Sequence, residues 1–530
     1  MSKKHNQLNG AQALLKTLVN SGIEVVFANP GTSEMHLVSA IGNNNKIRSI
    51  LCLFEGVVTG AADGYWRIKK KPSATLLHLG PGYANGMANL HNAKRAFSGI
   101  VNIVGDHATW HLKYDAPLTS DLLAHVNIHS DWVRKSNSAD DLAKIGAEAV
   151  SVSKSGWGKV STVMAPANHA WENGATEKPP LPISRKHKIS DKKILEFKKL
   201  IEKSKKCALL LGGDALEEET IYYASSIAQN FNAKLLAETF CSKIPRGEGR
   251  VHLERIPYFA ELAIKFLSCY DLIILIGAKD PVGFFAYPDV KSRLSPSKCK
   301  MYEFIKVDED ARYALKRIVK KYSLSASPLL QKAYYKLPKN KKLNPENMCT
   351  VIANELPDNC IISDEGITCS QVLYDATISS SKHDWLCITG GAIGQGLPVS
   401  FGASVAAPNK KVIAFQADGS AMYTIQTLWS MAREKSDVTV VIINNRSYSI
   451  LNIELKRLKA SKPNNKIKSM LDINKPFLDW VSIASGMGVP GYKAVTLDEF
   501  QYLFQKAMIK KGPFLIDVSI ENELETIFEN

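Results

Sequence analysis

The chain has 530 residues, which is enough for three or four domains that each bury a core of their own. Hydrophobic residues make up 45% of it and charged residues 22%, an ordinary composition for a globular protein. The formal net charge of +16 would suit a nucleic-acid-binding protein, but the lysines are spread over segments such as 192–206 and 336–342 and form no stripe with interleaved aromatic residues. We therefore do not expect nucleic acid as a partner.

Cysteine use and hydropathy limit the expected compartment. The nine cysteines include no CxxC pair, and Cys207, Cys360 and Cys387 lie in or beside apolar runs, where a thiol behaves as a small core residue. This pattern indicates a reducing compartment and argues against structural zinc. No apolar run approaches the roughly 18 residues that cross a bilayer, and the first ten residues lack the apolar core of a signal peptide. We expect a cytoplasmic protein with no membrane segment.

Strand-like and helical segments alternate from residue 10 to residue 170. A helical pattern over residues 10–21 is followed by apolar runs that predict strands. These runs cover residues 25–28, 49–54, 74–79 and 100–104. Because they are nearly continuous in apolar residues, they predict a parallel sheet with helices on both faces.

Polar residues stand where these strands end. Glu55 follows Phe54 at the end of a buried strand, where a carboxylate is costly unless it has a function. Alternatively, Glu55 is simply the first residue of an ordinary helix. His78 ends the next strand, and the near-neutral pKa of an unperturbed histidine suits proton transfer, although a packed core histidine would also satisfy the pattern. His107 and His111 follow the fourth strand, but no acidic third ligand accompanies this HxxxH pair, so we expect no metal there.

A proline- and lysine-rich linker at residues 174–190 leads to a second region with strand and helix patterns. Two of its apolar strands run into the glycine-rich turns 212–214 and 277–279, but no GxGxxG fingerprint is present, so a nucleotide is only weakly indicated. A basic linker at 336–344 leads to the last region. The expected fold class is α/β, with three doubly wound parallel-sheet domains. Their expected bounds are 1–173, 190–335 and 345–530.

The most informative stretch is a strand–helix–strand crossover in the last region. The apolar run 412–417 stops at Asp418, and apolar residues then recur at helical spacing over 422–432. A second apolar run, 438–443, ends at two asparagines, the second of which is Asn445. Since ligands bind at the carboxyl ends of the strands in an open parallel sheet, both strand ends predict a binding edge.

The residue types at this edge suit a divalent cation. Asp418 offers a carboxylate, Asn445 a side-chain carbonyl and Ser447 a backbone carbonyl, and 27 residues separate the first two, as a crossover requires. Mg²⁺ prefers such oxygen ligands and completes its octahedron with phosphate and water. Upstream, the strand 361–364 ends in a turn over 364–368, whose amides and hydroxyl suit a diphosphate.

The stretch from Asp418-Gly419-Ser420 to Asn444-Asn445 resembles the diphosphate-binding motif of thiamine diphosphate (ThDP) enzymes, with Ala417 where the first glycine is usual. The stretch FEGVVTGAADGYWR at 54–67 is similar to the pyrimidine-domain signature of the acetolactate synthase and benzoylformate decarboxylase branch, with Phe54 where histidine is common. Three further stretches match the family, so the resemblance covers nearly the whole chain. They are 29–32 (NPGT), 77–86 and 390–398.

The resemblance implies a role for each candidate residue. Glu55 would hydrogen-bond N1′ of the aminopyrimidine and promote the tautomer that takes the proton from C2. Thr32 would supply a small hydroxyl to the substrate pocket, His78 would move protons, and Ile393 would hold the cofactor bent. The remaining candidates would contact the cofactor or the metal. They are Gly366, Ile367, Thr368, Gly391, Gly419 and Ser420 for ThDP, and Asp418, Asn445 and Ser447 for Mg²⁺.

The function implied by the resemblance is ThDP- and Mg²⁺-dependent decarboxylation or carboligation of a small 2-oxo acid, through a cofactor-bound enamine. Which 2-oxo acid and which acceptor are used stays open. Glu55 and Asp418 lie on different domains, and in the family such residues meet across a subunit interface. The resemblance therefore implies a homodimer or homotetramer with active sites at that interface.

Two alternatives remain. One is an acetolactate synthase proper, which holds FAD in the middle domain. Phe284 and Phe285 stand where benzoylformate decarboxylase has a second histidine, and the bulky run 284–287 follows the turn 277–279, where a flavin would need space. FAD is therefore considered but not expected. The other alternative is a catalytically degenerate ThDP-binding scaffold, against which the presence of Glu55 and Asp418 argues.

Overall fold

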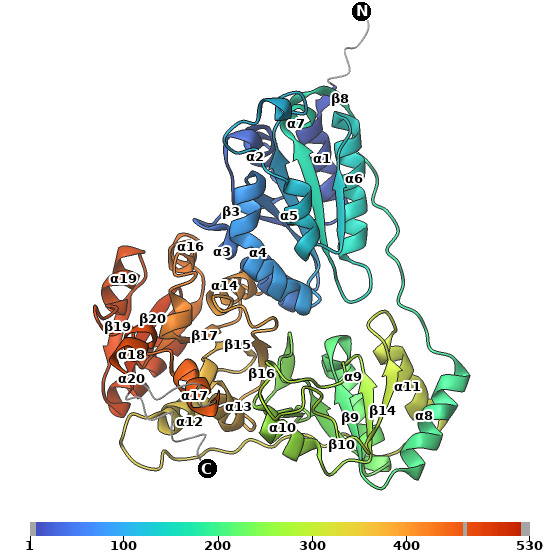
Figure 1. Ribbon diagram of the computed structural model, residues 1–530, viewed down its shortest axis with the longest axis vertical. Helices are drawn as coiled ribbons and strands as arrows, with labels where there is room; N and C mark the ends of the chain where they lie inside the picture. The colour runs from blue at the N-terminus through green and yellow to red at the C-terminus, as the bar shows by residue number, and fades with distance from the viewer. Residues whose placement is uncertain (1–6, 459–463, 521–530) are drawn as a thin grey trace, which may run out of the picture.

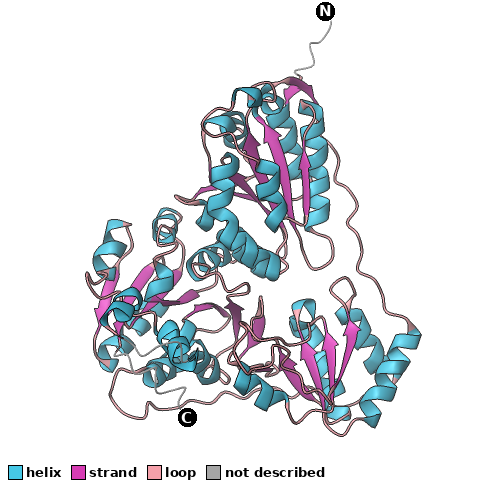
Figure 2. Ribbon diagram, viewed as in Figure 1, coloured by secondary structure: helices cyan, strands magenta, loops and turns pink. Residues whose placement is uncertain are grey.

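The computed structural model describes residues 7–458 and 464–520 of the chain. Three largely parallel sheets, which we call the N-terminal, middle and C-terminal sheets, form three bodies at the corners of a triangle (Figures 1 and 2). Helices cover both faces of each sheet. The expected α/β class with three doubly wound sheets is confirmed. No helix in the described part of the chain is both long and apolar enough to span a bilayer.

The N-terminal sheet has six parallel strands in the order β3-β2-β4-β5-β7-β6. The strands are β2 (Val25–Asn29), β3 (Arg48–Leu51), β4 (Ser73–Leu77), β5 (Ile100–Asp106), β6 (Trp132–Lys135) and β7 (Val160–Pro166). Helices α1 (Gly10–Asn20), α2 (Met35–Gly42), α6 (Ala139–Ser153) and α7 (Ala167–Trp171) cover one face. Helices α3 (Glu55–Lys69), α4 (Leu79–Arg95) and α5 (Leu122–His129) cover the other. A short antiparallel pair, β1 (Leu8–Asn9) and β8 (Asn173–Ala175), closes this body.

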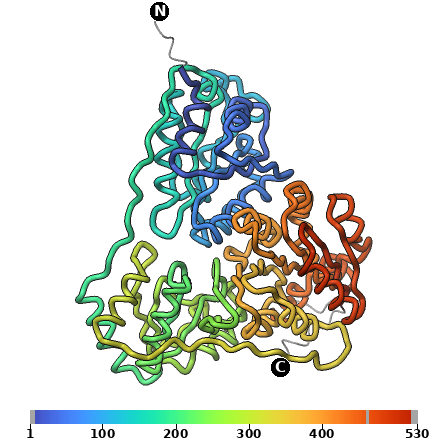
Figure 3. The backbone as a smooth tube through the Cα atoms, turned by 180° about the vertical axis from the view of Figure 1, so that it is seen from behind, coloured from blue at the N-terminus to red at the C-terminus, as the bar shows by residue number. Residues whose placement is uncertain are grey.

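The middle sheet has five parallel strands in the order β12-β10-β9-β13-β14. They are β9 (Cys207–Leu211), β10 (Lys234–Ala237), β12 (Glu254–Arg255), β13 (Leu272–Ile276) and β14 (Lys300–Ile305). Helices α8 (Asp191–Lys203), α9 (Glu218–Asn230) and α11 (Ala311–Lys321) pack on one face, and α10 (Ala260–Leu267) packs on the other. An extended linker joins this body to the N-terminal one, and a second long segment runs to the C-terminal body (Figure 3).

The C-terminal sheet has seven strands in the order β11-β16-β15-β17-β18-β20-β19. They are β11 (Ile244–Arg246), β15 (Cys360–Glu365), β16 (His383–Cys387), β17 (Val412–Ala417), β18 (Val438–Asn444), β19 (Gly491–Ala494) and β20 (Phe514–Ser519). Helices α12 (Pro345–Glu355), α13 (Ser370–Ala376) and α20 (Leu497–Ile509) pack on one face. Helices α14 (Gly396–Ala406), α16 (Thr427–Arg433) and α19 (Trp480–Gly486) pack on the other. The short helices α15 (Asp418–Ala421), α17 (Ser449–Leu458) and α18 (Asn465–Leu471) complete it.

The N-terminal and C-terminal sheets share one strand order, in which the first strand lies between the second and third and the sixth lies between the fourth and fifth. The C-terminal sheet differs by its edge strand β11, which comes from within the middle third of the chain and pairs antiparallel with β16. The sequence shows no repeat, so this relation is visible only in the structure. The middle body is thus tied to the C-terminal sheet by backbone hydrogen bonds.

Helices α3 and α14 hold the N-terminal and C-terminal bodies together, and one hydrophobic core continues across both. Their backbones approach closely because small residues face each other. A Cβ added at Gly64 would lie 2.1 Å from the carbonyl oxygen of Val399, and one added at Gly402 would lie 1.9 Å from that of Ala61. This contact fixes the position of one sheet relative to the other.

The crossover after β17 differs from the expectation in one respect. The sequence predicts one helix over 422–432, but the structure has α15, a turn and then α16. The turn forms because the hydroxyl of Thr424 donates to the carbonyl oxygen of Gly394 at 2.9 Å, and that of Thr427 donates to the carbonyl oxygen of Thr424 at 2.6 Å. A contact to a distant loop therefore overrides the local helical pattern.

Candidate active site

Glu55 is the first residue of α3 and lies at the carboxyl edge of the N-terminal sheet. It is buried, and Asn85 of α4 donates its side-chain amide to Oε2 at 3.0 Å. Gly82 leaves room beside it, since a Cβ added there would lie 3.2 Å from Oε1. Helix α4 therefore orients the carboxylate that the sequence singled out, through an asparagine that the sequence did not.

His78 caps α4 and belongs to a polar group with the turn before α2. Its Nδ1 lies 2.7 Å from Oε2 of Glu34 and 3.3 Å from the hydroxyl of Ser33. Glu34 is fully buried and accepts the backbone N–H of Gly31 at 2.8 Å. Because a carboxylate only accepts, Nδ1 of His78 is the donor, and Nε2 is left to act as acceptor or base.

Thr32, the hydroxyl expected in the substrate pocket, lies in the same turn but is exposed. The hydroxyl that reaches His78 belongs to its neighbour Ser33, which also donates to Oε1 of Glu34 at 2.9 Å. The sequence indicated no functional role for Ser33 or Glu34, because Glu34 resembles an acidic residue in the first turn of an ordinary helix. Leu79, directly after His78, has φ of +52°, and such strain in a non-glycine residue clusters at functional sites.

The crossover brings Asp418 and the turn at residues 445–447 together, as the sequence predicts for a metal site. Oδ2 of Asp418 accepts the backbone N–H of Arg446 at 2.6 Å, and Oδ1 accepts that of Gly419 at 2.8 Å. Oδ1 of Asn445 accepts the N–H of Ser447 at 3.0 Å and so shapes the turn. Arg446 takes the left-handed conformation at φ of +59°, which turns the chain back toward Asp418.

Asp418 is 2% exposed, and its burial raises the pKa to about 6, because the lost hydration outweighs the two N–H donors. A nearby cation would lower this pKa again, because it stabilises the ionised form. The described residues contain no group of three or more His, Cys, Asp or Glu arranged for a metal. The Asp418 edge differs from such clusters because it offers one carboxylate beside the turn at 445–447, which carries amide and carbonyl oxygens of the hard type that Mg²⁺ prefers.

The expected cofactor-binding turns lie at the same edge of the C-terminal sheet. The 3₁₀ turn at Ile367–Cys369 follows β15, with Ile367 at φ of +51° and Thr368 buried. Gly419 lies against the ring of Tyr448, which a Cβ would approach to 2.5 Å. Gly391, at φ of +78°, contacts the ring of Phe284. A side chain at either glycine would therefore clash.

Helix α4 also contacts the glycine-rich loop at residues 390–394. Asn89 donates to the carbonyl oxygens of both Gly56, at 2.8 Å, and Gly394, at 3.2 Å. Asn92 donates to the carbonyl oxygen of Ala392 at 2.8 Å and accepts its N–H at 3.2 Å. One helix thus connects the start of α3, where Glu55 lies, to the loop that carries Ile393.

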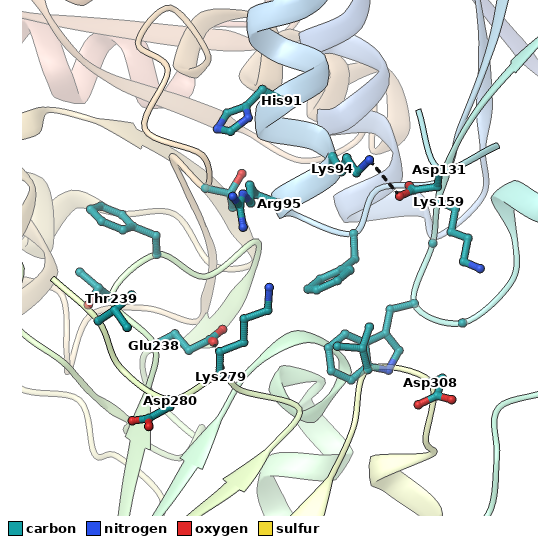
Figure 4. Close-up of a pocket in the computed structure, with 18 of the residues that line it drawn as sticks. His91, Lys94, Arg95, Asp131, Lys159, Glu238, Thr239, Lys279, Asp280 and Asp308 are labelled. Carbon is teal, nitrogen blue, oxygen red and sulfur yellow. Dashed lines mark hydrogen bonds and ion pairs between the residues drawn. The ribbon is translucent and has the colours of Figure 1, made fainter. Parts of the chain in front are cut away.

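A cavity of about 1000 Å³ lies between the N-terminal body and the carboxyl edge of the middle sheet (Figure 4). Arg95, Lys159, Glu238 and Lys279 are among the residues that line it. Oε1 of Glu238 accepts the backbone N–H of Lys279 at 3.0 Å. Burial raises the pKa of Glu238 to about 7.

The indole of Trp157 covers both glycine-rich turns of the middle sheet beside this cavity. A Cβ added at Gly213 would lie 1.9 Å from it, and one added at Gly277 would lie 2.5 Å from it. The ring of Phe97 packs edge-on against Trp157, with centroids 5.1 Å apart. Phe284, which was expected to fill flavin space, lines the cavity and packs on Gly391, Phe240 and Tyr258. The ring over the turns is one that the sequence did not indicate.

Two parts of the chain match models of known protein families. Residues 8–127 match the family model of the thiamine pyrophosphate enzyme N-terminal TPP binding domain, and residues 366–518 match that of the C-terminal TPP binding domain. A Mycobacterium tuberculosis protein, IlvX, provisionally named an acetolactate synthase large subunit, is 44% identical over 516 residues, which cover 97% of this chain and 99% of IlvX.

The chain belongs to the thiamine pyrophosphate enzyme family.

The chain is also similar to two decarboxylases. Benzoylformate decarboxylase of Pseudomonas aeruginosa is 24% identical over 541 residues, covering 96% of this chain and 98% of that one. The structure of the ThDP-dependent 4-hydroxybenzoylformate decarboxylase of Rhodococcus jostii RHA1 superposes with a TM-score of 0.84 at 24% identity, over 97% of this chain and 99% of that one. The second likeness shows that the three-sheet fold is that of a ThDP enzyme. Glu55, His78 and Asp418 fall within the two matched TPP binding domains.

Proposed function

We propose that this ThDP enzyme also requires Mg²⁺ and that it breaks or forms the bond next to the carbonyl of a small 2-oxo acid, by decarboxylation, carboligation or both. The observation that carries the proposal is the meeting of buried Asp418 with the turn at 445–447 at a sheet edge of a family member. When bound, ThDP supplies the reactive carbon and the electron sink.

The residues of the C-terminal sheet edge would hold the cofactor's charged end. Asp418, the side-chain carbonyl of Asn445 and the backbone carbonyl of Ser447 would bind Mg²⁺, and the turn at 366–368 with Gly419 and Ser420 would bind the diphosphate. Supporting this assignment, Asp418 loses hydration on burial, and a bound cation would compensate for that loss. Gly391 and Ile393 would contact the organic part of ThDP from the loop above.

Glu55 would exchange a proton with N1′ of the pyrimidine, held in place by Asn85. His78 would take or give a proton at the substrate through Nε2, while Glu34 fixes its tautomer by accepting from Nδ1. Thr32 and Ser33 would both offer hydroxyls to the substrate, of which Ser33 is already hydrogen-bonded to the His78 group.

We propose that a second copy of the chain completes each active site, as a dimer or tetramer. Supporting this, Glu55 and Asp418 stand at the edges of separate sheets. A cytoplasmic location is proposed because all nine cysteines, which lie in the described residues, are free thiols and eight of them are buried.

An acetolactate synthase with FAD is the second candidate. The 44% identity to IlvX favours its carboligase activity. Trp157 covers the turns that would bind the flavin phosphates, which disfavours FAD binding. A catalytically inactive scaffold is disfavoured by the presence of Glu55, Asp418 and Asn445. We therefore propose a flavin-free enzyme.

A panel of aliphatic and aromatic 2-oxo acids tests the proposal. The purified protein, supplied with ThDP and Mg²⁺, is assayed for CO₂ release, and products are identified with and without an aldehyde or a second 2-oxo acid as acceptor. We expect CO₂ release that depends on both ThDP and Mg²⁺. Release without any acceptor would favour a decarboxylase, and release coupled to a new carbon–carbon bond would favour a carboligase. An absence of turnover with tightly bound ThDP would support the scaffold.

A further inference from the structure

Glu365 is a buried carboxylate that the roles proposed above do not use. It ends β15, is 1% exposed and accepts four N–H donors. Oε1 accepts the backbone N–H groups of Gly394 at 2.6 Å and Gln395 at 3.3 Å. Oε2 accepts the backbone N–H of Gly396 at 2.6 Å and the side-chain amide of Gln416 at 2.8 Å. Three of these donors are the consecutive amides of residues 394–396, which lead into α14 and end at its first residue.

The start of a helix attracts an anion, because its first N–H groups lack partners within the helix and the dipole is positive there. In α14 the protein fills this position with its own carboxylate rather than leaving it to a ligand. The arrangement is costly, since burial raises the pKa of Glu365 to about 7 in spite of the four donors. A buried carboxylate with such a raised pKa is a candidate for a functional role, and the partner that it holds indicates which role.

That partner is the loop at residues 390–396, which carries Ile393. The carbonyl oxygen of Gly394 is fixed from the opposite side by Asn89 at 3.2 Å and by the hydroxyl of Thr424 at 2.9 Å. Gly394 has φ of +91°, so the loop turns sharply there. With its amides on Glu365 and its carbonyl on Asn89 and Thr424, the loop has one shape, and Ile393 is placed directly before the fixed residues.

We propose that Glu365 is a positioning residue, which fixes the 390–396 loop so that Ile393 is presented to the cofactor in the reactive arrangement. This rests on the proposed function, in which Ile393 contacts ThDP. Only an ionised carboxylate can accept all four N–H groups, because an amide would turn an N–H toward one of them. The charge, and not the size of the side chain, is what the loop requires.

The test compares three substitutions. Glu365→Gln keeps the size and removes the charge, Glu365→Asp keeps the charge, and Glu355→Gln is a matched control. Glu355 lies in the same body and accepts the side-chain amide of Gln505 at 2.7 Å, away from the loop. The first readout is hydrogen–deuterium exchange of peptides covering 390–396 in protein without ThDP. The second is kcat at saturating ThDP, Mg²⁺ and substrate, beside ThDP affinity by calorimetry.

We expect Glu365→Gln to speed exchange of the amides at 394–396 at least tenfold and to lower kcat at least tenfold at saturation. Glu365→Asp should fall between it and the unchanged protein, and Glu355→Gln should match the unchanged protein. Unchanged loop exchange in Glu365→Gln overturns the proposal, as does faster exchange with an unchanged kcat, which describes a merely structural residue.

Two further outcomes also have a defined interpretation. If Glu365→Gln does not fold, Glu365→Asp decides alone, and wild-type exchange together with wild-type kcat in that variant overturns the proposal. If the unchanged protein binds no ThDP, the proposed function fails. The positioning role toward the cofactor then falls with it, while the exchange data still establish whether Glu365 holds the loop.

Discussion

Two of the buried carboxylates lie at strand ends with similar donors but different surroundings. Asp418 accepts two backbone N–H groups beside the turn at 445–447, whereas Glu365 accepts four N–H groups beside the loop at 390–396. In both, lost hydration outweighs these donors, so the pKa rises to about 6 in Asp418 and to about 7 in Glu365. We infer that Asp418 serves a cation and that Glu365 serves the protein's own loop.

The Asp418→Asn variant tests the metal assignment with almost no change in size. We expect Mg²⁺-dependent ThDP affinity to fall at least a hundredfold, because the only ionised ligand proposed is lost. Calorimetric titration of ThDP with and without Mg²⁺ measures this. Asp498→Asn, an exposed acid in the same body, is the control and should bind normally. Equal affinities for the Asp418 variant and the unchanged protein would refute the metal site.

Glu55→Gln should leave ThDP affinity within a few-fold of the unchanged protein and lower turnover by about 10²–10⁴-fold, the range lost with a general acid–base group. The amide keeps the shape but cannot exchange a proton with N1′. Exchange of the C2 proton of bound ThDP, followed by rapid quench and NMR, locates the loss. Glu24→Gln, at the amino edge of the same sheet, is the control. Wild-type exchange in the Glu55 variant would make Glu55 structural.

Glu365 also predicts how stability depends on pH. Its pKa is raised from 4.5 when unfolded to about 7 when folded, so between these values the folded protein binds more protons. Its contribution therefore falls as pH rises from about 4.5 to about 7, by on the order of 3 kcal/mol. In protein without ThDP, the unfolding midpoint of the unchanged protein should drop relative to that of Glu365→Gln over this interval. A constant difference would contradict the prediction.

At the scale of elements, the contact between α3 and α14 joins two sheets through small residues. Alanine normally stabilises a helix relative to glycine, by about 0.5–1 kcal/mol. At Gly402 the sign should reverse, because the new Cβ would lie 1.9 Å from the backbone oxygen of Ala61 and one helix must move. The contact therefore requires glycine for its close approach.

Gly402→Ala should destabilise the protein by about 1–3 kcal/mol, the usual cost of overpacking. Gly42→Ala, at the last residue of α2, is the matched control, since a Cβ there meets nothing within 4 Å. Thermal unfolding of both variants measures the difference. The prediction fails if Gly402→Ala is as stable as Gly42→Ala.

At the scale of the whole molecule, the middle body separates the two enzyme candidates. The cavity beside it is large and carries cationic side chains such as Arg95 and Lys279, but Trp157 from the N-terminal body covers both turns suited to phosphate. The packing of one body on another therefore decides whether these turns can bind a ligand.

We expect the purified protein to be colourless and to reach full activity without added FAD. Absorbance of the purified protein and assays with and without FAD measure this. Flavin absorbance stoichiometric with protein would overturn the prediction and favour an acetolactate synthase that binds FAD. Trp157→Gly, which uncovers the turns, is an informative companion, because any flavin binding gained by it would identify the indole as the obstacle.

The sequence by itself determined the fold class and the positions of Glu55, His78, Asp418 and Asn445 at strand ends. These features are local: an apolar run marks a buried strand, and the polar residue that stops it marks the edge. The spacing of 27 residues between Asp418 and Asn445 also follows from one crossover, so their meeting could be predicted.

Only the tertiary structure decided which side chains support those residues. The hydrogen-bonded pairs Glu34–His78, Glu365–Gly394 and Asn92–Ala392 are separated along the chain by 44, 29 and 300 residues. The periodicity of the sequence does not predict such pairs, because they depend on how helices and sheets pack and not on local conformation. The same holds for Trp157, whose place over the middle turns follows from the docking of two bodies that the sequence alone leaves unspecified.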